Sequence, residues 1–187
     1  MLEHAPGDVA VHQKLAPLLA DSGETTAAIE SFQLAARGQI EQGFDDRAIG
    51  VYVQAVGYFP EQFGLWEAIA ELHLKAGRGA DALRAFLDAR EELRTPADRP
   101  VAMLCLSRAL ELEAGSSLDK KSPRLAHTLD LAALCGKEGQ RERADQLLED
   151  LANVEPGALR QVRWAQFKLS PTPRHLWRWL FPRSDDE

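Results

Sequence analysis

Residues 63–94 contain two amphipathic runs of helical period joined by a turn that contains glycine. One face of the first run consists of Trp66, Ile69, Ala70 and His73, and one face of the second consists of Ala82, Phe86 and Ala89. The small residues allow two antiparallel helices to approach closely, and Trp66 and Phe86 fill the space beside them. Gly77 can adopt the left-handed backbone that ends a helix. The stretch therefore predicts a helical hairpin.

The same pattern occurs earlier in the chain, at a constant offset. When residue 9 is placed over residue 63 without a gap, glycines fall on glycines and packing residues on packing residues. The matched pairs are Gly23 with Gly77, Ala28 with Ala82, Phe32 with Phe86, Ala35 with Ala89, Ala48 with Ala102, and Ala55 with Ala109. Sequence identity between the two segments is low, and the chain is rich in alanine. The evidence for a duplication is therefore that the matches fall at close-packing and turn positions. We predict two equivalent three-helix units, residues 9–60 and 63–114.

A third copy of the hairpin pattern follows a polar segment. Residues 115–124 predict a polar loop, and the pattern resumes in residues 125–169. Its characteristic positions are Thr128, Leu131, Ala132, Cys135, Gly139, Ala144, Leu148 and Leu151. Gly139 lies farther from Gly77 than Gly77 lies from Gly23, and the polar loop accounts for the difference.

The hairpin at residues 63–94 resembles a tetratricopeptide repeat (TPR). The residues that occupy the characteristic slots of that motif are Trp66, Ile69, Ala70, Gly77, Ala82, Phe86 and Ala89. The resemblance implies an all-α fold, an array of about nine or ten helices in antiparallel hairpins, and a role in binding other proteins. Gly43 and Gly77 are separated by one period of this family, roughly 34 residues, but Gly23 and Gly43 are much closer together. The choice of helices that line the concave face therefore stays open.

The beginning of the chain predicts a flexible lead, residues 1–8, and then a helix that Asp8 could cap. Pro17 should kink this helix or delay its regular part, because proline lacks a backbone donor. Its packing face should carry Val11, Leu15, Leu18 and Leu19. A later helix should be capped by Asp45 or Asp46 and end before Pro60.

Composition narrows the classes of partner and the compartment. The chain has 187 residues and a net charge of −7, which disfavours nucleic acid and anionic membranes as principal partners. No apolar run is long enough to span a bilayer, and the first residues lack the pattern of a secretory signal. We therefore expect a cytoplasmic protein. Cys105 and Cys135 lie in apolar helical runs and are expected to be buried, unpaired thiols.

No catalytic constellation stands out. Gly77 and Gly79 begin a string that resembles a dinucleotide-binding turn, but a helical run rather than a buried strand precedes them. His73 occupies a packing slot, and none of the five histidines has metal-ligand spacing. The sequence therefore predicts a protein that is not an enzyme and has no cofactor, no catalytic residues and no metal ligands.

The last part of the chain, residues 170–187, predicts a capping helix followed by an acidic tail. Three of the four tryptophans lie at or just before this part, among the basic residues Arg160, Arg163, Arg174, Arg178 and Arg183. Three interpretations compete: a cap over the open end of the array, an exposed Trp/Arg surface for a protein partner, and docking to a membrane surface. The cap is favoured over the partner surface, and the membrane comes last.

A specific arrangement of this cap is expected. One stripe should be buried against Leu148, Leu151 and Trp164, and its members are Leu176, Trp177, Leu180 and Phe181. Trp179 lies off the stripe and should be the more exposed tryptophan.

We predict a non-catalytic scaffold or adaptor that binds a protein segment along the array. The alternative is a regulatory module that docks through its C-terminal Trp/Arg-rich helix onto a larger complex or a membrane surface. The candidate partner-binding residues are Trp179, Arg174, Arg178, Glu67 and Glu71.

Overall fold

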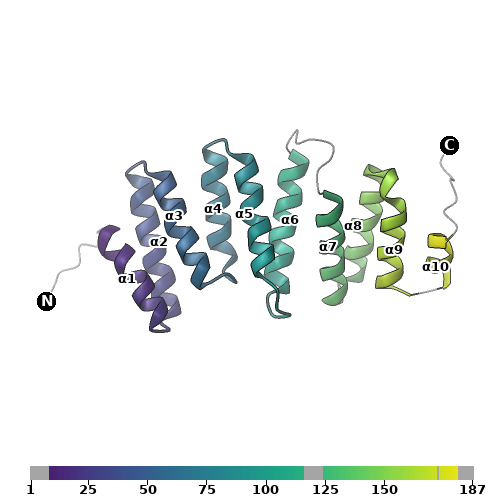
Figure 1. The fold of residues 1–187 in the computed structure, drawn as a ribbon, viewed down its shortest axis with the longest axis horizontal. Coiled ribbons are helices and arrows are strands. Elements are labelled where there is room, and N and C mark those ends of the chain that lie inside the picture. The colour runs from purple at the N-terminus through teal and green to yellow at the C-terminus, as the bar shows by residue number, and fades with distance from the viewer. Residues whose placement is uncertain (1–8, 116–123, 172, 181–187) are drawn as a thin grey trace. The chain divides into compact units, whose positions relative to one another are not determined.

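The computed structural model describes residues 9–115, 124–171 and 173–180 (Figure 1). Within these ranges it contains α-helices, one short 3-10 turn (Pro156–Ala158) and no strand. The helices are α1 (Val9–Asp21), α2 (Thr25–Glu41), α3 (Asp45–Tyr58), α4 (Phe63–Lys75), α5 (Gly79–Glu92), α6 (Arg99–Gly115), α7 (Arg124–Lys137), α8 (Arg141–Val154), α9 (Leu159–Leu169) and α10 (Pro173–Leu180). The all-α, TPR-like fold expected from the sequence is therefore confirmed. The expected flexible lead, most of the polar loop and the acidic tail lie outside the described residues.

The chain divides into two compact units, Met1–Val101 and Ala102–Glu187. The division falls inside α6 and therefore inside the second of the two three-helix units expected from the sequence. Within each unit, helices pack mainly against their neighbours in the chain. The domain boundaries read from the sequence stay a prediction.

Four glycines end helices in the same way. Gly23, Gly43, Gly77 and Gly139 have φ values of 83°, 80°, 74° and 76°. In each turn the glycine N–H donates to the carbonyl three residues earlier, and the next N–H donates to the carbonyl five residues before it. This is the Schellman motif, which satisfies carbonyls that a helix end leaves without a partner. The turns expected at these glycines, including the one at the false dinucleotide motif, are confirmed.

The helix boundaries follow the spacing found in the sequence. α4, α5 and α6 begin at the same offset from α1, α2 and α3 that separates Gly77 from Gly23, and α8 begins and ends at the offset from α5 that separates Gly139 from Gly77. The paired positions are also buried alike, from Phe32 and Phe86 to the alanines that match between the two segments. Superposition of residues 9–60 on residues 63–114 stays a prediction.

Trp66 belongs to the core of the first unit, as expected. Its side chain is 7% exposed, and its indole Nε1–H donates to the carbonyl oxygen of Pro60 at 2.9 Å. Phe63 stacks on Phe86, with 6.1 Å between the ring centroids. These contacts join α4 both to α5 and to the turn that precedes α4.

The packing face expected for α1 is partly wrong. Leu15 and Leu19 are half-buried, but Leu18 is 65% exposed and Val11 is also exposed, whereas Ala16 is fully buried. The buried face is rotated toward Val9, whose side chain lies where a Cβ on Gly38 of α2 would be. That close approach fixes the rotation of α1, because only a glycine leaves room for Val9. The hydrophobic pattern alone does not contain this information.

α1 is already helical from Val9, so Pro17 does not delay its regular part, and the kink expected as the alternative stays a prediction. The cap expected for α3 is wrong. Asp45 and Asp46 occupy the first turn of α3 rather than its cap, and the residue before the helix, Phe44, makes no side-chain cap hydrogen bond. Acidic side chains in a first turn still interact favourably with the helix dipole.

The second unit has a core of its own. The largest side chains that it buries fully are Leu106, Leu131, Leu148 and Val162. Cys105 and Cys135 are buried, unpaired thiols, as expected. Burial raises the pKa of the Cys105 thiol to about 12 and also raises the pKa of Cys135. Gly136 of α7 lets α9 approach closely, since a Cβ there would overlap the side chain of Leu169.

Candidate protein-binding surface

One surface of the first unit joins three consecutive helices. Tyr52 of α3 is half-buried, and burial raises the pKa of its phenol; nearby Arg37 of α2 lowers that pKa and Glu71 of α4 raises it. Both charged side chains act on the same hydroxyl group, so the three residues share one neighbourhood. Arg37 and Glu71 are exposed to solvent.

The candidate residues Glu67 and Glu71 lie one turn apart on α4. Together with Leu74 they form the outward stripe of that helix, opposite the buried residues Leu65, Ile69 and Leu72. Glu67 is half-buried, and Glu71 and Leu74 are exposed. We call Arg37, Tyr52, Glu67, Glu71 and Leu74 the α2–α4 surface. It offers charges of both signs, a hydroxyl group and one apolar side chain to a partner.

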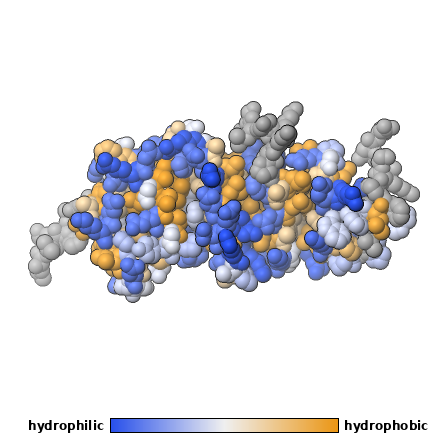
Figure 2. Space-filling model, in the orientation of Figure 1, coloured by the Kyte–Doolittle hydropathy of each residue, from blue (hydrophilic) through white to orange (hydrophobic). Residues whose placement is uncertain are grey.

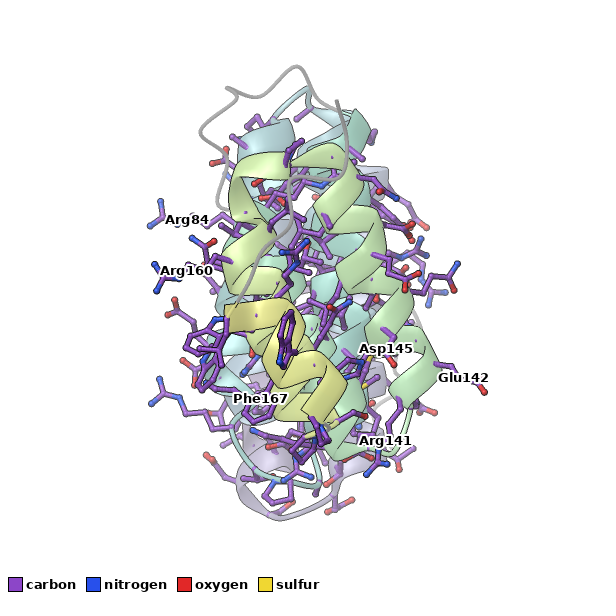
Figure 3. The ribbon with its side chains drawn as sticks, turned by 90° about the vertical axis from the view of Figure 1, so that its right-hand side faces the viewer. Arg84, Arg141, Glu142, Asp145, Arg160 and Phe167 are labelled. Carbon is purple, nitrogen blue, oxygen red and sulfur yellow. The ribbon has the colours of Figure 1, made fainter. Side chains whose placement is uncertain are left out.

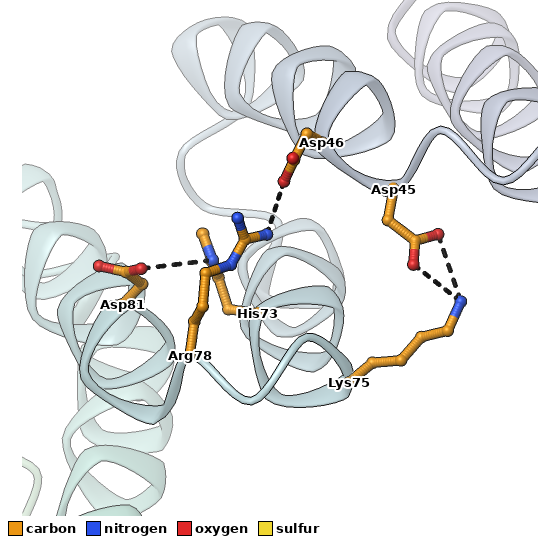
Figure 4. Close-up of polar contacts among 6 residues, drawn as sticks. All are labelled: Asp45, Asp46, His73, Lys75, Arg78 and Asp81. Atoms are coloured by element: carbon orange, nitrogen blue, oxygen red, sulfur yellow. Dashed lines mark hydrogen bonds and ion pairs between the residues drawn. The ribbon is translucent and has the colours of Figure 1, made fainter.

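Ion pairs link the start of α3 to α4 and to the turn that follows α4 (Figure 4). Lys75 Nζ lies 2.9 Å from Asp45 Oδ2, and an Arg78 guanidinium nitrogen lies 2.6 Å from Asp46 Oδ1. The first pair joins the start of α3 to the last residue of α4, and the second joins it to the turn after α4. Such exposed pairs contribute about 0–1 kcal/mol each. They bridge the helix that carries Tyr52 and the end of the helix that carries Glu71.

His73 lies close to this cluster. Its side chain is half-buried, as expected from its packing slot, and Nδ1 lies 3.9 Å from Asp81 Oδ2. His73 therefore contributes to packing between α4 and α5.

The second unit carries an aromatic and basic surface on α9. Arg160, Arg163, Trp164, Phe167 and Lys168 recur at helical spacing and form what we call the α9 outer face, opposite buried Val162 and Gln166. Phe167 stacks on Trp164, with ring centroids 5.6 Å apart, and Lys168 Nζ lies 5.3 Å from the Trp164 centroid. Trp164 nevertheless stays 39% exposed.

The expected order of exposure in α10 is wrong. Trp177 is 60% exposed and Leu180 is 51% exposed, whereas Trp179 is half-buried with its ring 4.9 Å from that of Trp164. Residues two apart on a helix point in nearly opposite directions, so only one of the two tryptophans can face α9. Trp179 is the one that faces α9, because its ring packs against the ring of Trp164.

The expected cap also included the return of α10 to the array and the basic residues on that helix. α10 packs against α9, as expected for a segment that returns to the array. Arg174 and Arg178 lie on α10, but their side chains, like that of Leu176 and the whole of Phe181, are outside the described residues. Glu67 and Glu71 belong to the first unit, whereas the candidates on α10 belong to the second.

One buried polar pair was missed by sequence reasoning. Glu113 of α6 is buried, and its Oε1 lies 3.1 Å from Nδ1 of half-buried His127 on α7. The polar loop separates the two residues in the chain, so no local spacing signals the pair. It joins α6 to α7 across the second unit.

The described residues lack two further features. None of them forms a group of three or more His, Cys, Asp or Glu side chains that could hold a metal ion. No helix in the described part of the chain combines the length and apolarity needed to cross a membrane.

No known protein family and no curated protein matches this sequence. Among solved structures, the chain is similar to the MamA protein, with 10% identity over 80% of this chain and 93% of that chain, at a TM-score of 0.29. It is also similar to TPR-like repeats of a kinesin light chain from Podosopora anserina, with 18% identity over 91% of this chain and 100% of that chain, at a TM-score of 0.27.

A further similar structure is PilF of Pseudomonas aeruginosa, with 19% identity over 91% of this chain and 84% of that chain, at a TM-score of 0.27. The TPR-like character of this chain rests on its own helical hairpins, turn glycines and buried small residues. The described residues have an all-α, TPR-like fold.

Proposed function

We propose that this protein is a non-catalytic, cytoplasmic scaffold or adaptor that binds a protein segment on the α2–α4 surface. Repeat arrays of helical hairpins expose extended surfaces that suit such segments. The observation that carries the proposal is the neighbourhood of Arg37, Tyr52 and Glu71, since three successive helices contribute to one surface.

The composition of this surface suits a segment with mixed charge. Arg37 and Glu71 can each pair with a side chain of opposite sign, and the Tyr52 hydroxyl can donate or accept a hydrogen bond. Exposed Leu74 supplies an apolar contact at one end of the α4 stripe. Figure 2 shows that hydrophobic residues interrupt the hydrophilic surface on the face that it draws.

A charge-reversal experiment tests this proposal. Proteins captured from native cytoplasm by the unchanged chain are compared with those captured by a Glu67→Lys, Glu71→Lys variant. The matched control is Glu142→Lys, Glu149→Lys, which makes the same change of charge at exposed positions of α8. We expect the α4 variant to lose the captured proteins and the α8 variant to keep them. Equal retention by both variants would count against the α2–α4 surface.

A second candidate function is regulatory docking through the C-terminal helix onto a larger complex. The observation that favours it is the exposure of Trp177, at 60%, beside exposed Leu180 on the short helix α10. Tryptophan is enriched among the residues that dominate the energy of protein interfaces. This candidate and the α2–α4 surface lie in different units of the chain.

A further inference from the structure

We propose that the α9 outer face, together with Trp179 of α10, binds a short acidic segment of a partner protein. The inference rests on the second candidate function, because it names the centre of that docking site and the chemistry of its partner. It is independent of the α2–α4 surface.

The geometry of α9 separates an inner face from an outer one. Val162 and Gln166 are buried in the second unit, and Leu169 fits against Gly136 of α7. The residues on the other side of the helix are the members of the α9 outer face. Exposed Arg160 and Lys168 lie toward its two ends, and Trp164 lies midway between them.

The aromatic part of this surface is assembled within the unit itself. Phe167 and Trp179 both contact Trp164, at centroid distances of 5.6 and 4.9 Å. These contacts restrict the indole of Trp164 while 39% of the residue stays exposed. A side chain that is already ordered loses little conformational entropy on binding, so more of the contact energy contributes to affinity.

The charge of this region differs from that of the rest of the chain. α9 carries three cations, Arg160, Arg163 and Lys168, and no aspartate or glutamate. Since the whole chain carries −7, the remainder carries −10. Figure 3 shows that Arg160 points to one side of the second unit, whereas Glu142 of α8 points to the other. The α9 outer face is therefore a local cationic surface on an acidic protein, and it complements an anionic partner.

The same charge distribution favours a short segment over a long polyanion. Exposed charges interact over about 10 Å at 0.1 M ionic strength. A nucleic acid strand or an anionic bilayer extends well beyond that distance and would meet the acidic remainder of the chain. A short acidic peptide can instead be confined to α9.

The spacing of the charged residues predicts the pattern of the peptide. Arg160 and Lys168 stand just over two helical turns apart, which corresponds to about 12 Å along the axis of an α-helix. An extended peptide covers that distance in about four residues. We therefore expect two acidic residues about four positions apart, with an aromatic or large aliphatic residue midway that packs on Trp164.

A random-peptide phage library, selected on the full-length protein, tests the proposal. We expect selected peptides to carry that pattern and to bind an Arg160→Glu, Lys168→Glu variant at least about tenfold more weakly, since two charge-assisted contacts become repulsive. Lys137→Glu, Arg141→Glu is the matched control, because both residues are exposed in the same unit. It should change affinity by no more than about twofold, as expected for charges outside the contact. Circular dichroism confirms that each variant is folded.

Peptide binding by further variants distinguishes this inference from the functions proposed above. Peptides that depend on Glu67 and Glu71 belong to the α2–α4 surface and are set aside. If the remaining peptides are weakened by Trp177→Ser but not by Arg160→Glu, Lys168→Glu, docking through α10 stands and this inference fails. If neither variant weakens them, both fail.

The proposal is also overturned if the remaining peptides are neutral or basic. Tighter binding of an oligothymidine strand or of phosphatidylserine vesicles than of the selected peptides would overturn it in favour of a nucleic acid or a membrane.

Discussion

Tryptophans serve different purposes in the two units. In the first unit, Trp66 is 7% exposed, and its indole N–H is satisfied by a backbone carbonyl. At the end of the second unit, Trp164 is partly exposed and Trp177 largely so. The difference follows from the helix face that carries each residue, because Trp66 is among the buried residues of α4, whereas Trp164 lies opposite the buried residues Val162 and Gln166 of α9. A residue type alone therefore does not distinguish core from contact surface in a repeat array.

The strongest test of this comparison removes each tryptophan in turn. Trp66→Ala should lower the free energy of unfolding by about 3–5 kcal/mol, because a large buried side chain leaves a cavity. Trp177→Ala should change it by less than about 0.5 kcal/mol, as is usual for exposed positions. Urea denaturation monitored by circular dichroism measures both values. Similar losses for the two variants would show that Trp177 is part of a core.

The second test asks whether the hairpins of the two units use their turns alike. Gly77→Ala and Gly139→Ala should each cost about 1–2 kcal/mol, because both glycines have positive φ. Gly50→Ala, in the middle of α3 with open space around the new methyl group, should instead stabilise the protein by about 0.5–1 kcal/mol. Thermal melting measures all three. A loss of stability for only one of these two alanine variants would show that the two turns are not equivalent.

The third test concerns the aromatic contact between α9 and α10. Trp164→Ala should cost about 1 kcal/mol, the order of one aromatic pair, and should increase the exposure of Trp179. Acrylamide quenching measures that exposure in two variants that keep Trp179 as their only tryptophan, one with Trp164→Phe, which retains an aromatic ring, and one with Trp164→Ala. Unchanged quenching would mean that Trp179 is buried by something other than Trp164.

The smallest effect is expected at the ion pairs beside α4. Lys75→Ala and Arg78→Ala should each cost no more than about 1 kcal/mol, and the cost should decrease at high salt. Unfolding measured at low and high salt checks this. A loss of several kcal/mol that did not respond to salt would indicate a packing role instead.

The sequence predicts the parts of the fold that depend on local spacing. The glycine turns and the burial of Trp66 follow from residues that lie within one hairpin. The rotation of α1 could not be predicted in this way, because it depends on the gap that Gly38 leaves for Val9. The choice between Trp177 and Trp179 likewise depends on Trp164 in another helix.

The candidate site likewise combines features that local spacing predicts with contacts between helices that it does not. Glu67 and Glu71 could be placed on one stripe from their spacing. The proximity of Glu71 to Arg37 and Tyr52 depends on how three helices pack. The ion pairs of Asp45 and Asp46 likewise depend on how α3 packs beside α4. Contacts between helices are set by how the helices pack, which short-range patterns do not encode.

The Schellman turns have a consequence for how the protein acquires its structure. Each turn closes a hairpin within a few residues, so most packed helices are close together in the chain. Chains dominated by such short-range contacts lose little loop-closure entropy before their contacts form, and they fold rapidly. A hairpin such as α4 with α5 can therefore serve as a nucleus onto which neighbouring helices add one at a time. The glycines that end helices in the finished protein would thereby also determine where its folding can start.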